Sequence, residues 1–264
     1  MPRTRVNGID MYYEVHGAGE PLLMIAGLGG DTRGYAPVLP ALAERYKVVL
    51  FDNRGAGQTE KPEEPYSVPM FAADTVGLLD ALDIDRAHII GGSMGGIIAQ
   101  EVAINYPDRV KSLVLISTTA RVDNLMRAIT ESWRIAAENL DRKLLAKFML
   151  PWGFSPEFYE NHAAELEMAE AMLVENPQPL YAFLNQLNAT MNYDATDRLS
   201  RISAPTLVMV AREDILTPLR FAHVLCGAIP RAKLVVLPRG GHGAFIAEAP
   251  AEGVAAILEF LGSL

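Results

Sequence analysis

The segment 89–98 places a serine on a turn between two apolar elements, and this feature constrains the fold more than any other part of the chain. It reads Ile-Ile-Gly-Gly-Ser-Met-Gly-Gly-Ile-Ile, with Ser93 flanked by glycines. Met94, Ile98 and Val102 recur at helical spacing, which predicts a helix directly after the serine. A strand, a Gly-x-Ser-x-Gly turn and a helix in this order are typical of a nucleophile elbow, because larger neighbours would clash at so sharp a turn. A glycine-rich turn that only packs tightly has the same pattern.

The rest of the chain alternates short apolar runs with helical patterns. Continuous apolar runs are typical of strands buried on both faces, and they lie at 21–26, 47–51, 86–90, 110–117, 205–210 and 233–237. Helical patterns lie at 35–45, 67–82, 96–105, 218–227 and 250–261, and Ser67 is the expected N-cap of the second. Asn7-Gly8 between strand formers predicts a hairpin near the N-terminus. The alternation predicts an α/β fold with a mostly parallel sheet.

The alternation stops between about residues 119 and 201. This block shows no strand pattern, only helical stretches at 124–148, 156–175 and 179–192. It is rich in aromatic residues and methionine, which suits a lid over an apolar pocket, although the same residues would also form the block's own core. We therefore expect a core domain of residues 1–118 and 202–264 with 119–201 inserted as a helical cap. The side chains expected to line the pocket are Trp133, Trp152, Phe154 and Phe245.

Three chemically active residue types follow predicted strands. Ser93, Asp214 and His242 each stand at a strand end, and ligands of open α/β sheets bind beyond the carboxyl ends of the strands. A serine hydroxyl is a weak nucleophile until a base takes its proton. Histidine acts as such a base near neutral pH, and a carboxylate holds it in the required tautomer. Glu213, next to Asp214, is the alternative acid.

An acyl-transfer site also needs donors for the oxyanion. The backbone N–H of Met94, at the start of the predicted helix, is one candidate. The loop Gly27–Gly30 follows another strand and is expected to supply the second from Leu28.

The sequence lacks the motifs that are typical of several other functional classes. The histidines form no metal-ligand spacing, Thr32 stands where a dinucleotide site needs its third glycine, and no P-loop lysine is present, so we expect neither metal nor cofactor. A net charge of −9 argues against nucleic acid or an anionic membrane as partner. One cysteine, no signal-peptide pattern and no apolar run of spanning length predict a soluble cytoplasmic protein. Asp52 is expected in a structural turn that contains an ion pair with Arg54.

The chain resembles the α/β-hydrolase family, in particular serine esterases and lactonases related to 3-oxoadipate enol-lactonases. The motifs that carry the resemblance are Gly-Gly-Ser93-Met-Gly-Gly, Asp52-x-Arg54-Gly-x-Gly-x-Thr59, Asp214-Ile-Leu-Thr-Pro218, and Gly241-His242 followed by Glu248-x-Pro250. The resemblance implies an eight-stranded sheet with strand two antiparallel, helices on both faces and a cap after strand six. It also implies Ser93 as nucleophile, His242 as base and Asp214 as acid.

The chain departs from some family members at single positions. Many have His-Gly at the oxyanion loop, where this chain has Ala26-Gly27. Related C–C bond hydrolases often carry Asn before the serine and an aromatic after the histidine, where Gly92 and Gly243 stand here. Haloalkane dehalogenases and epoxide hydrolases need an aspartate in place of Ser93.

The sequence therefore predicts a cofactor-free serine hydrolase acting on a small-molecule carboxylic ester or lactone with an apolar portion. Two alternative activities would use the same Ser93, His242 and Asp214, namely C–C bond hydrolysis of a diketone and perhydrolysis. A third alternative is a ligand receptor that has kept the hydrolase fold but does not turn over a substrate. A monomer and a homodimer are both compatible with the sequence, and the identity of the substrate is not encoded in any motif.

Overall fold

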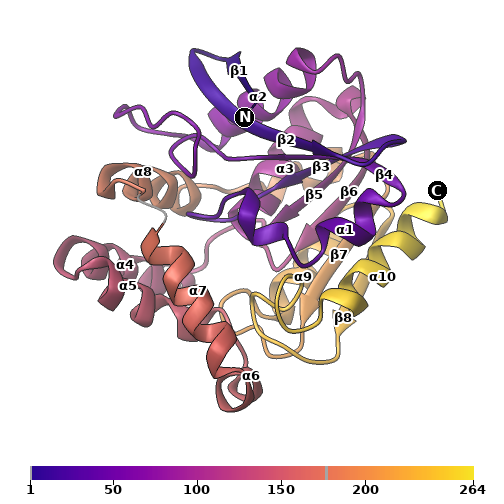
Figure 1. Cartoon of the computed structure of the whole chain (residues 1–264). Coiled ribbons are helices and arrows are strands. Elements are labelled where there is room, and N and C mark those ends of the chain that lie inside the picture. The colour runs from indigo at the N-terminus through magenta and orange to yellow at the C-terminus, as the bar shows by residue number, and fades with distance from the viewer. Residues whose placement is uncertain (1, 176–177) are drawn as a thin grey trace.

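One sheet of eight strands organises the molecule, as seen in the computed structural model, which describes residues 2–175 and 178–264 (Figure 1). The strand order is β1-β2-β4-β3-β5-β6-β7-β8. The strands are β1 (Arg3–Val6), β2 (Ile9–His16), β3 (Glu20–Ile25), β4 (Tyr46–Phe51), β5 (Ala87–Gly92), β6 (Val110–Ile116), β7 (Thr206–Ala211) and β8 (Ala232–Leu237). Strand β2 runs antiparallel to both of its neighbours, and β3 to β8 pair in parallel. This confirms the expected sheet.

The N-terminal hairpin forms at the expected turn. Asn7 and Gly8 have φ angles of 43° and 81°, and they connect β1 to β2 in antiparallel register. Both turn positions of such a hairpin need positive φ, which asparagine and glycine adopt at low cost.

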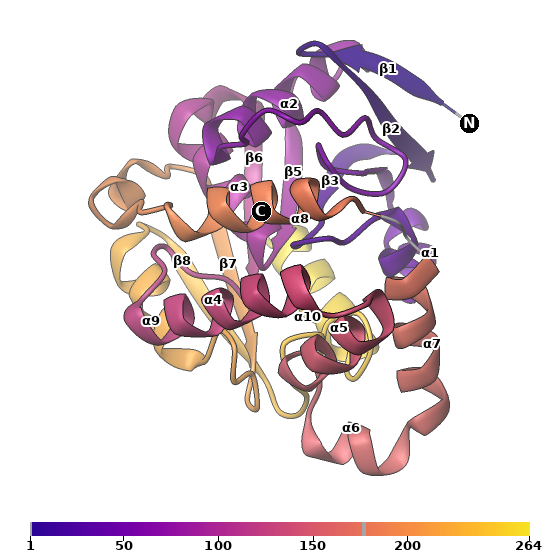
Figure 2. The ribbon, with the colours of Figure 1, turned by 90° about the vertical axis from the view of Figure 1, so that its left-hand side faces the viewer.

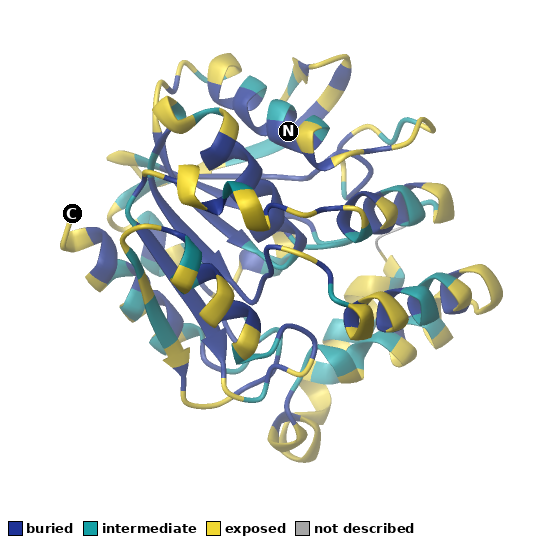
Figure 3. Ribbon diagram, turned by 180° about the vertical axis from the view of Figure 1, so that it is seen from behind, coloured by how far each residue is buried: buried dark blue, intermediate teal, exposed yellow. Residues whose placement is uncertain are grey.

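Helices cover both faces of the sheet, so successive residues of a central strand are buried on opposite sides. Leu23 and Ile25 of β3 pack with α2 (Val68–Ala81), α3 (Met94–Asn105) and α9 (Leu219–Ala228). Leu22 and Met24 pack with α1 (Leu39–Ala43) and α10 (Pro250–Gly262). Figure 3 shows the strands dark blue between helices whose outer faces are exposed. Each large apolar side chain buried in this way contributes about 1.5–3 kcal/mol to stability, which explains why the strand segments are continuous apolar runs.

Three predicted helical stretches, 35–45, 124–148 and 156–175, are not continuous helices. The last is divided at His162, and the first two are interrupted for local reasons. Within the stretch 35–45 only Leu39–Ala43 (α1) is α-helical, because Pro40 lacks an N–H and is tolerated only in a first helical turn, and a 3₁₀ turn (Thr32–Tyr35) precedes it. The stretch 124–148 is interrupted where Asp141 accepts a hydrogen bond from the N–H of Leu144 at 2.9 Å and starts a new helix. The N-cap expected at Ser67 is present.

Within the described part of the chain, five α-helices lie between β6 and β7, in the block expected to form the cap (Figure 2). They are α4 (Asn124–Asn139), α5 (Arg142–Met149), α6 (Pro156–Asn161), α7 (Ala163–Glu175) and α8 (Leu180–Met191), with 3₁₀ turns at Leu150–Trp152 and Thr196–Arg201. Further 3₁₀ turns lie outside the block, as at Pro107–Arg109. Leu199 in the last turn of the block packs with the core cluster around α3. The exact domain boundaries at 119 and 201 stay a prediction.

Glycines at two positions of the turn between β5 and α3 are required by close approach of the backbone. A Cβ added at Gly91 would lie 2.2 Å from the carbonyl oxygen of Gly95, and one at Gly95 would lie 2.0 Å from that of Ile25. At Gly92 the nearest atom, the carbonyl oxygen of Ile116, would be 4.0 Å away. The Gly-x-Ser-x-Gly pattern is therefore a packing requirement at its outer positions and not at Gly92.

We expect Gly91→Ala and Gly95→Ala each to lower the free energy of unfolding by about 2–3 kcal/mol or more, because the added methyl group forces the backbone apart. Gly92→Ala should change it by less than about 1 kcal/mol. Urea unfolding of the three variants checks this. A Gly92→Ala protein as unstable as Gly91→Ala would contradict it.

Candidate active site

The backbone of Ser93 adopts a conformation that side chains rarely take. Its φ and ψ are 53° and −120°, which costs of order 1–3 kcal/mol. The Ser93 N–H donates to the carbonyl of Ile116 at 2.9 Å, and its own carbonyl accepts from the N–H of Gly96 at 3.0 Å and from the hydroxyl of Thr118 at 2.7 Å. These hydrogen bonds come from β6, α3 and the loop after β6, so they hold the strained turn from three directions.

The carboxylate of Asp214 is fully enclosed and holds the ring of His242. His242 Nδ1 lies 3.0 Å from Asp214 Oδ2 and 3.3 Å from Oδ1. Asp214 Oδ1 also accepts from the N–H groups of Leu216 and Thr217, at 3.0 and 2.7 Å, and Oδ2 accepts from the Thr217 hydroxyl at 2.7 Å. With Nδ1–H donating to Asp214, the other ring nitrogen, Nε2, carries the lone pair.

Asp214 stays ionised because of its interaction with His242 and the hydrogen bonds that it accepts. Burial opposes ionisation of this carboxyl, but the His242 imidazolium, its hydrogen bond and the donors of Thr217 outweigh burial and lower the pKa of Asp214 from 3.8 to about 2. The neighbouring Glu213, the alternative acid, has no side-chain hydrogen bond to His242 among the described contacts. Asp214 is therefore the carboxylate in contact with the imidazole.

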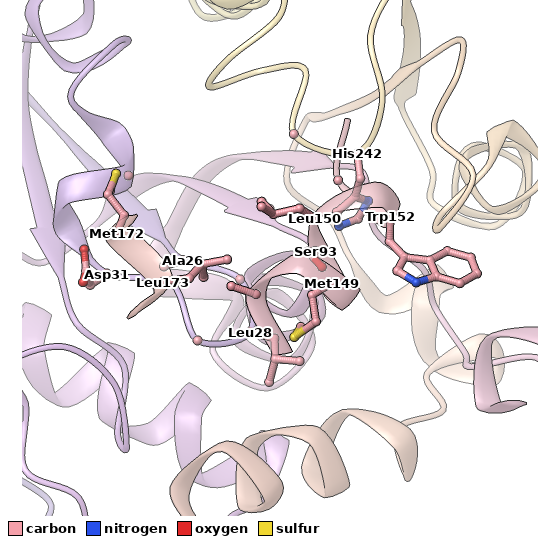
Figure 4. A pocket seen from close by; sticks show the side chains of 18 of the residues that line it. Ala26, Leu28, Asp31, Ser93, Met149, Leu150, Trp152, Met172, Leu173 and His242 are labelled. Atoms are coloured by element: carbon pink, nitrogen blue, oxygen red, sulfur yellow. The ribbon is translucent and has the colours of Figure 1, made fainter. Parts of the chain in front are cut away.

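Ser93 and His242 face the same cavity (Figure 4). Among the described contacts no hydrogen bond joins the Ser93 hydroxyl to the His242 ring. The hydroxyl sits on a freely rotating bond, and catalytic hydrogen bonds are often long before substrate binds and shorten afterwards.

Two backbone donors lie beside Ser93. The N–H groups of Met94, the first residue of α3, and of Leu28, in the loop after β3, donate to no group among the described residues. The loop approaches the serine closely, since a Cβ added at Gly27 would lie 3.2 Å from the Ser93 Cβ. The N–H at the start of α3 also lies at the positive end of the helix dipole.

The cavity has a volume of about 760 Å³ and lies between the sheet and the inserted helices. Most of its lining is apolar, and the charged side chains among the described lining residues are Asp31, Arg33, Asp141 and Arg142. Figure 4 places Ser93 and His242 near Trp152, and Met172 and Leu173 of α7 toward Asp31. The pocket is thus mostly apolar and extends from Ser93 and His242 toward Met172 and Leu173.

Three of the four expected pocket residues line this cavity, namely Trp133, Trp152 and Phe245. The expectation for Phe154 is wrong. Its ring stacks on Phe158 with centroids 4.9 Å apart, and its backbone lies against the loop that carries His242, where a Cβ added at Gly241 would meet it at 2.8 Å. Phe154 therefore packs the histidine loop from outside the cavity.

A water-sized chamber of about 20 Å³ adjoins the main cavity behind Ser93. The two share Leu28, Ser93, Trp133 and Leu216 as walls. The indole N–H of Trp133 is buried and has no hydrogen-bond partner among the described residues.

A second serine–histidine–carboxylate set lies at the opposite end of the strands. His88 Nδ1 is 2.8 Å from the Ser112 hydroxyl, and its Nε2 is 2.9 Å from Glu20 Oε2. Ser112 is fully buried, and neither described cavity touches it or His88. This set joins β3, β5 and β6 away from both cavities, so we assign it a structural role.

The expected ion pair of Asp52 with Arg54 is wrong. Arg54 instead pairs with the buried Asp74, with Nε and Oδ2 2.8 Å apart, and Asp52 accepts from the N–H groups of Thr32 and Gln58. Burial raises the pKa of Asp52, because those two donors only partly offset the loss of water. The turn has a structural role, as expected, but backbone N–H groups and not a cation bind the Asp52 carboxylate.

Sequence reasoning missed two residues that hold the site. Thr118 binds the Ser93 carbonyl, and Thr217 binds the Asp214 carboxylate and lies 3.0 Å from His242 Nδ1 through its hydroxyl. Thr217 belongs to the Asp214–Pro218 motif. A threonine three residues after an aspartate can donate a hydrogen bond to its carboxylate, so this spacing could have predicted the contact. No pattern distinguishes Thr118 from its neighbours in Ser-Thr-Thr.

No helix within the described part of the chain is both long and apolar enough to span a bilayer. Across residues 2–175 and 178–264, no three His, Cys, Asp or Glu side chains gather in a way that would hold a metal ion.

Comparisons with known proteins give matches over nearly the whole chain. A family model described as alpha/beta hydrolase fold matches residues 20–249. A protein of Azorhizobium caulinodans named as a candidate carbamate hydrolase, RutD, is 33% identical over 268 residues, covering 100% of this chain and 99% of the relative. A Mycobacterium tuberculosis protein named as a candidate non-heme bromoperoxidase, BpoC, is 30% identical, covering 97% and 99%. The enol-lactonase structure from Burkholderia xenovorans superposes with a TM-score of 0.92 at 27% identity, covering 99% and 100%. These matches confirm the resemblance that the motifs indicated.

The lowered pKa of Asp214 predicts a pH dependence of stability. Because the folded pKa of about 2 lies below the unfolded value of 3.8, the ionised carboxylate stabilises the fold by about 2 kcal/mol above pH 4. This contribution is lost as the pH falls from about 4 toward 2. The difference in unfolding free energy between wild type and Asp214→Asn should shrink between pH 6 and pH 3, whereas Glu213→Gln should show no such trend. A constant difference for Asp214→Asn would contradict the assignment.

Proposed function

Because the chain belongs to the α/β-hydrolase family, we propose that it is a serine hydrolase that cleaves a carboxylic ester or lactone with an apolar portion. The observation that carries the proposal is the arrangement of the strained Ser93 and the Asp214-bound His242 on one cavity wall. The N–H groups of Leu28 and Met94, which donate to no group among the described residues, lie beside the serine, where a developing oxyanion needs donors.

The proposed reaction has two halves. Ser93 Oγ bonds to the carbonyl carbon while His242 Nε2 takes the hydroxyl proton, and the carbonyl electron pair moves to oxygen, facing Leu28 and Met94. Collapse of this intermediate expels the alcohol, which takes the proton from His242 and leaves an acyl-enzyme. Water then gives its proton to His242 and attacks the same carbon, which releases the acid and returns the proton to Ser93. Asp214 keeps its charge throughout and stabilises the imidazolium.

The cavity supports the apolar portion of the substrate. Its volume of about 760 Å³ lies within the range of small-molecule sites, and the wall from Leu28 to Leu173 is mostly apolar. Each methylene group buried there contributes about 0.8 kcal/mol to binding. A substrate of this class would place its carbonyl at Ser93 and its hydrocarbon part along α5 and α7.

A carbamate or a peracid is the second candidate for the acyl chemistry. A relative named for carbamate hydrolysis matches the full chain at 33% identity, and one named for bromoperoxidase activity matches at 30%. A carbamate presents the same carbonyl to Ser93, and peroxide in place of water would convert the acyl-enzyme to a peracid. Parallel assays of esters, lactones, carbamates, a vinylogous diketone, and acetate plus peroxide with a halide acceptor separate these reactions.

Ser93→Ala should lower kcat on p-nitrophenyl acetate by roughly 10⁴-fold or more and abolish labelling by a fluorophosphonate, because the variant lacks the hydroxyl that forms the acyl-enzyme in the proposed reaction. Thermal unfolding of the variant serves as the control for folding. Unchanged turnover would exclude the proposed mechanism. Saturable ligand binding by a wild type without turnover would favour a receptor.

Leu173→Trp should shorten the pocket at the end near Asp31. We expect kcat/KM for p-nitrophenyl octanoate to fall by roughly tenfold or more while that for the acetate stays within twofold, since about two or three methylene groups lose their place. Met168→Trp is the matched control, because Met168 lies on the same helix, is 60% exposed and does not line the cavity. An equal loss for both esters would contradict the proposed path of the chain.

A further inference from the structure

Gln186, in cap helix α8, is a fully buried amide whose side-chain hydrogen bonds all leave its own helix. Its Oε1 accepts from the N–H of Gly29 at 3.0 Å and from Nε2 of Gln178 at 3.0 Å. Its Nε2 donates to the carbonyl of Arg54 at 2.8 Å. One side chain therefore joins the cap to the loop after β3 and to the loop after β4.

The orientation of this amide is fixed by its partners. The Arg54 carbonyl only accepts, so it requires the NH₂ group, and the Gly29 N–H only donates, so it requires the oxygen. Gln178 reinforces the arrangement, because its Nε2 also donates to the carbonyl of Gly55 at 2.8 Å. A flipped amide would lose the bonds to both Gly29 and Arg54.

Gly29 directly follows Leu28, the proposed oxyanion donor, in a loop with little support of its own. Gly30 N–H to the Gly27 carbonyl, at 3.1 Å, is the backbone hydrogen bond described within the loop. The loop has glycine at three of four positions, and Gly29 has a φ of 68°, so its unrestrained backbone would sample many conformations. A donor stabilises an oxyanion well only if it is already in place when the charge develops.

We propose that Gln186 is a positioning residue that fixes the Leu28 N–H for the oxyanion by holding Gly29. The role rests on the proposed function, since it concerns the same acyl-transfer site. Gln186 does not line the cavity, so it acts through the loop and not on the substrate. The cap thereby contributes to turnover as well as to the binding pocket.

Asn185 offers a matched comparison on the same helix. Its Nδ2 donates to the carbonyls of Glu63 and Glu64, at 3.2 and 3.0 Å. It therefore joins α8 to the core through the same chemistry as Gln186 but has no bond to the loop of Leu28. If the cap merely needs attachment to the core, the two residues should behave alike.

The test compares two inhibitors of the same shape. A trifluoromethyl ketone adds the Ser93 hydroxyl to its carbonyl and forms a bound oxyanion, whereas the matching methyl ketone binds largely as the neutral carbonyl compound. Gln186→Met, which is similar in volume, should weaken the trifluoromethyl ketone by roughly 10- to 100-fold and lower kcat on p-nitrophenyl acetate by a similar factor. KM and the methyl ketone constant should change by less than about threefold.

Asn185→Ala should lower the melting temperature while leaving the ratio of the two inhibition constants within twofold of wild type. An unchanged ratio for Gln186→Met, or an equal change in Asn185→Ala, would overturn the positioning role. If Gln186→Met does not fold, Gln178→Ala, which removes one donor to Gln186 Oε1, undergoes the same inhibitor comparison. Gln178 also lines the cavity, so the criterion for this variant is the ratio of the two inhibition constants, in which an equal effect of the cavity wall on both ketones cancels. Wild-type turnover that disappears in Ser93→Ala establishes the proposed function separately, so the two ideas fail in different measurements.

Discussion

The strained backbone at Ser93 is the constraint on which the rest of the structure depends. A positive φ at a non-glycine residue costs of order 1–3 kcal/mol, and it persists because β5, β6 and α3 meet at this point with almost no free space. Gly91 and Gly95 allow that approach, and the Thr118 hydroxyl holds the serine carbonyl. The parallel sheet, buried on both faces, supplies the rigid support, and the hydroxyl is displayed into the cavity as a result.

The inserted segment is hydrogen-bonded to the loop that carries Leu28 and to the loop that carries His242. Gln186 holds the loop of Leu28. On the other side, the N–H of Gly243 donates to the carbonyl of Gly153 at 2.7 Å, and Glu248 accepts from both Gly241 and Ser155. The same hydrogen bonds therefore connect the pocket wall to the groups proposed to perform the chemistry. A change in the cap that accommodates a new substrate would also act on the loops around Ser93.

Local patterns in the sequence predicted the parts of the fold that depend on period and turn chemistry. Continuous apolar runs predicted the buried strands, Asn7-Gly8 predicted the hairpin, and Ser67 predicted an N-cap, because each feature is determined by residues next to one another in the chain. The predictions that failed involve competition between segments. Arg54 pairs with Asp74, twenty residues on, and Phe154 packs on the histidine loop, since the choice among available partners is made only when distant elements meet.

The sequence by itself determined the α/β alternation, the glycine-flanked serine, and the presence of an aspartate and a histidine after later strands. Tertiary structure decided that Asp214 and not Glu213 meets His242, that Thr118 and Thr217 complete the hydrogen bonds, and that His88 with Ser112 stays closed to substrate. The physical reason is that residue type and local spacing encode what a side chain can do, whereas distance, burial and access are properties of the packed chain as a whole. Gln186 carries no local signature at all, and only the folded cap brings it to Gly29.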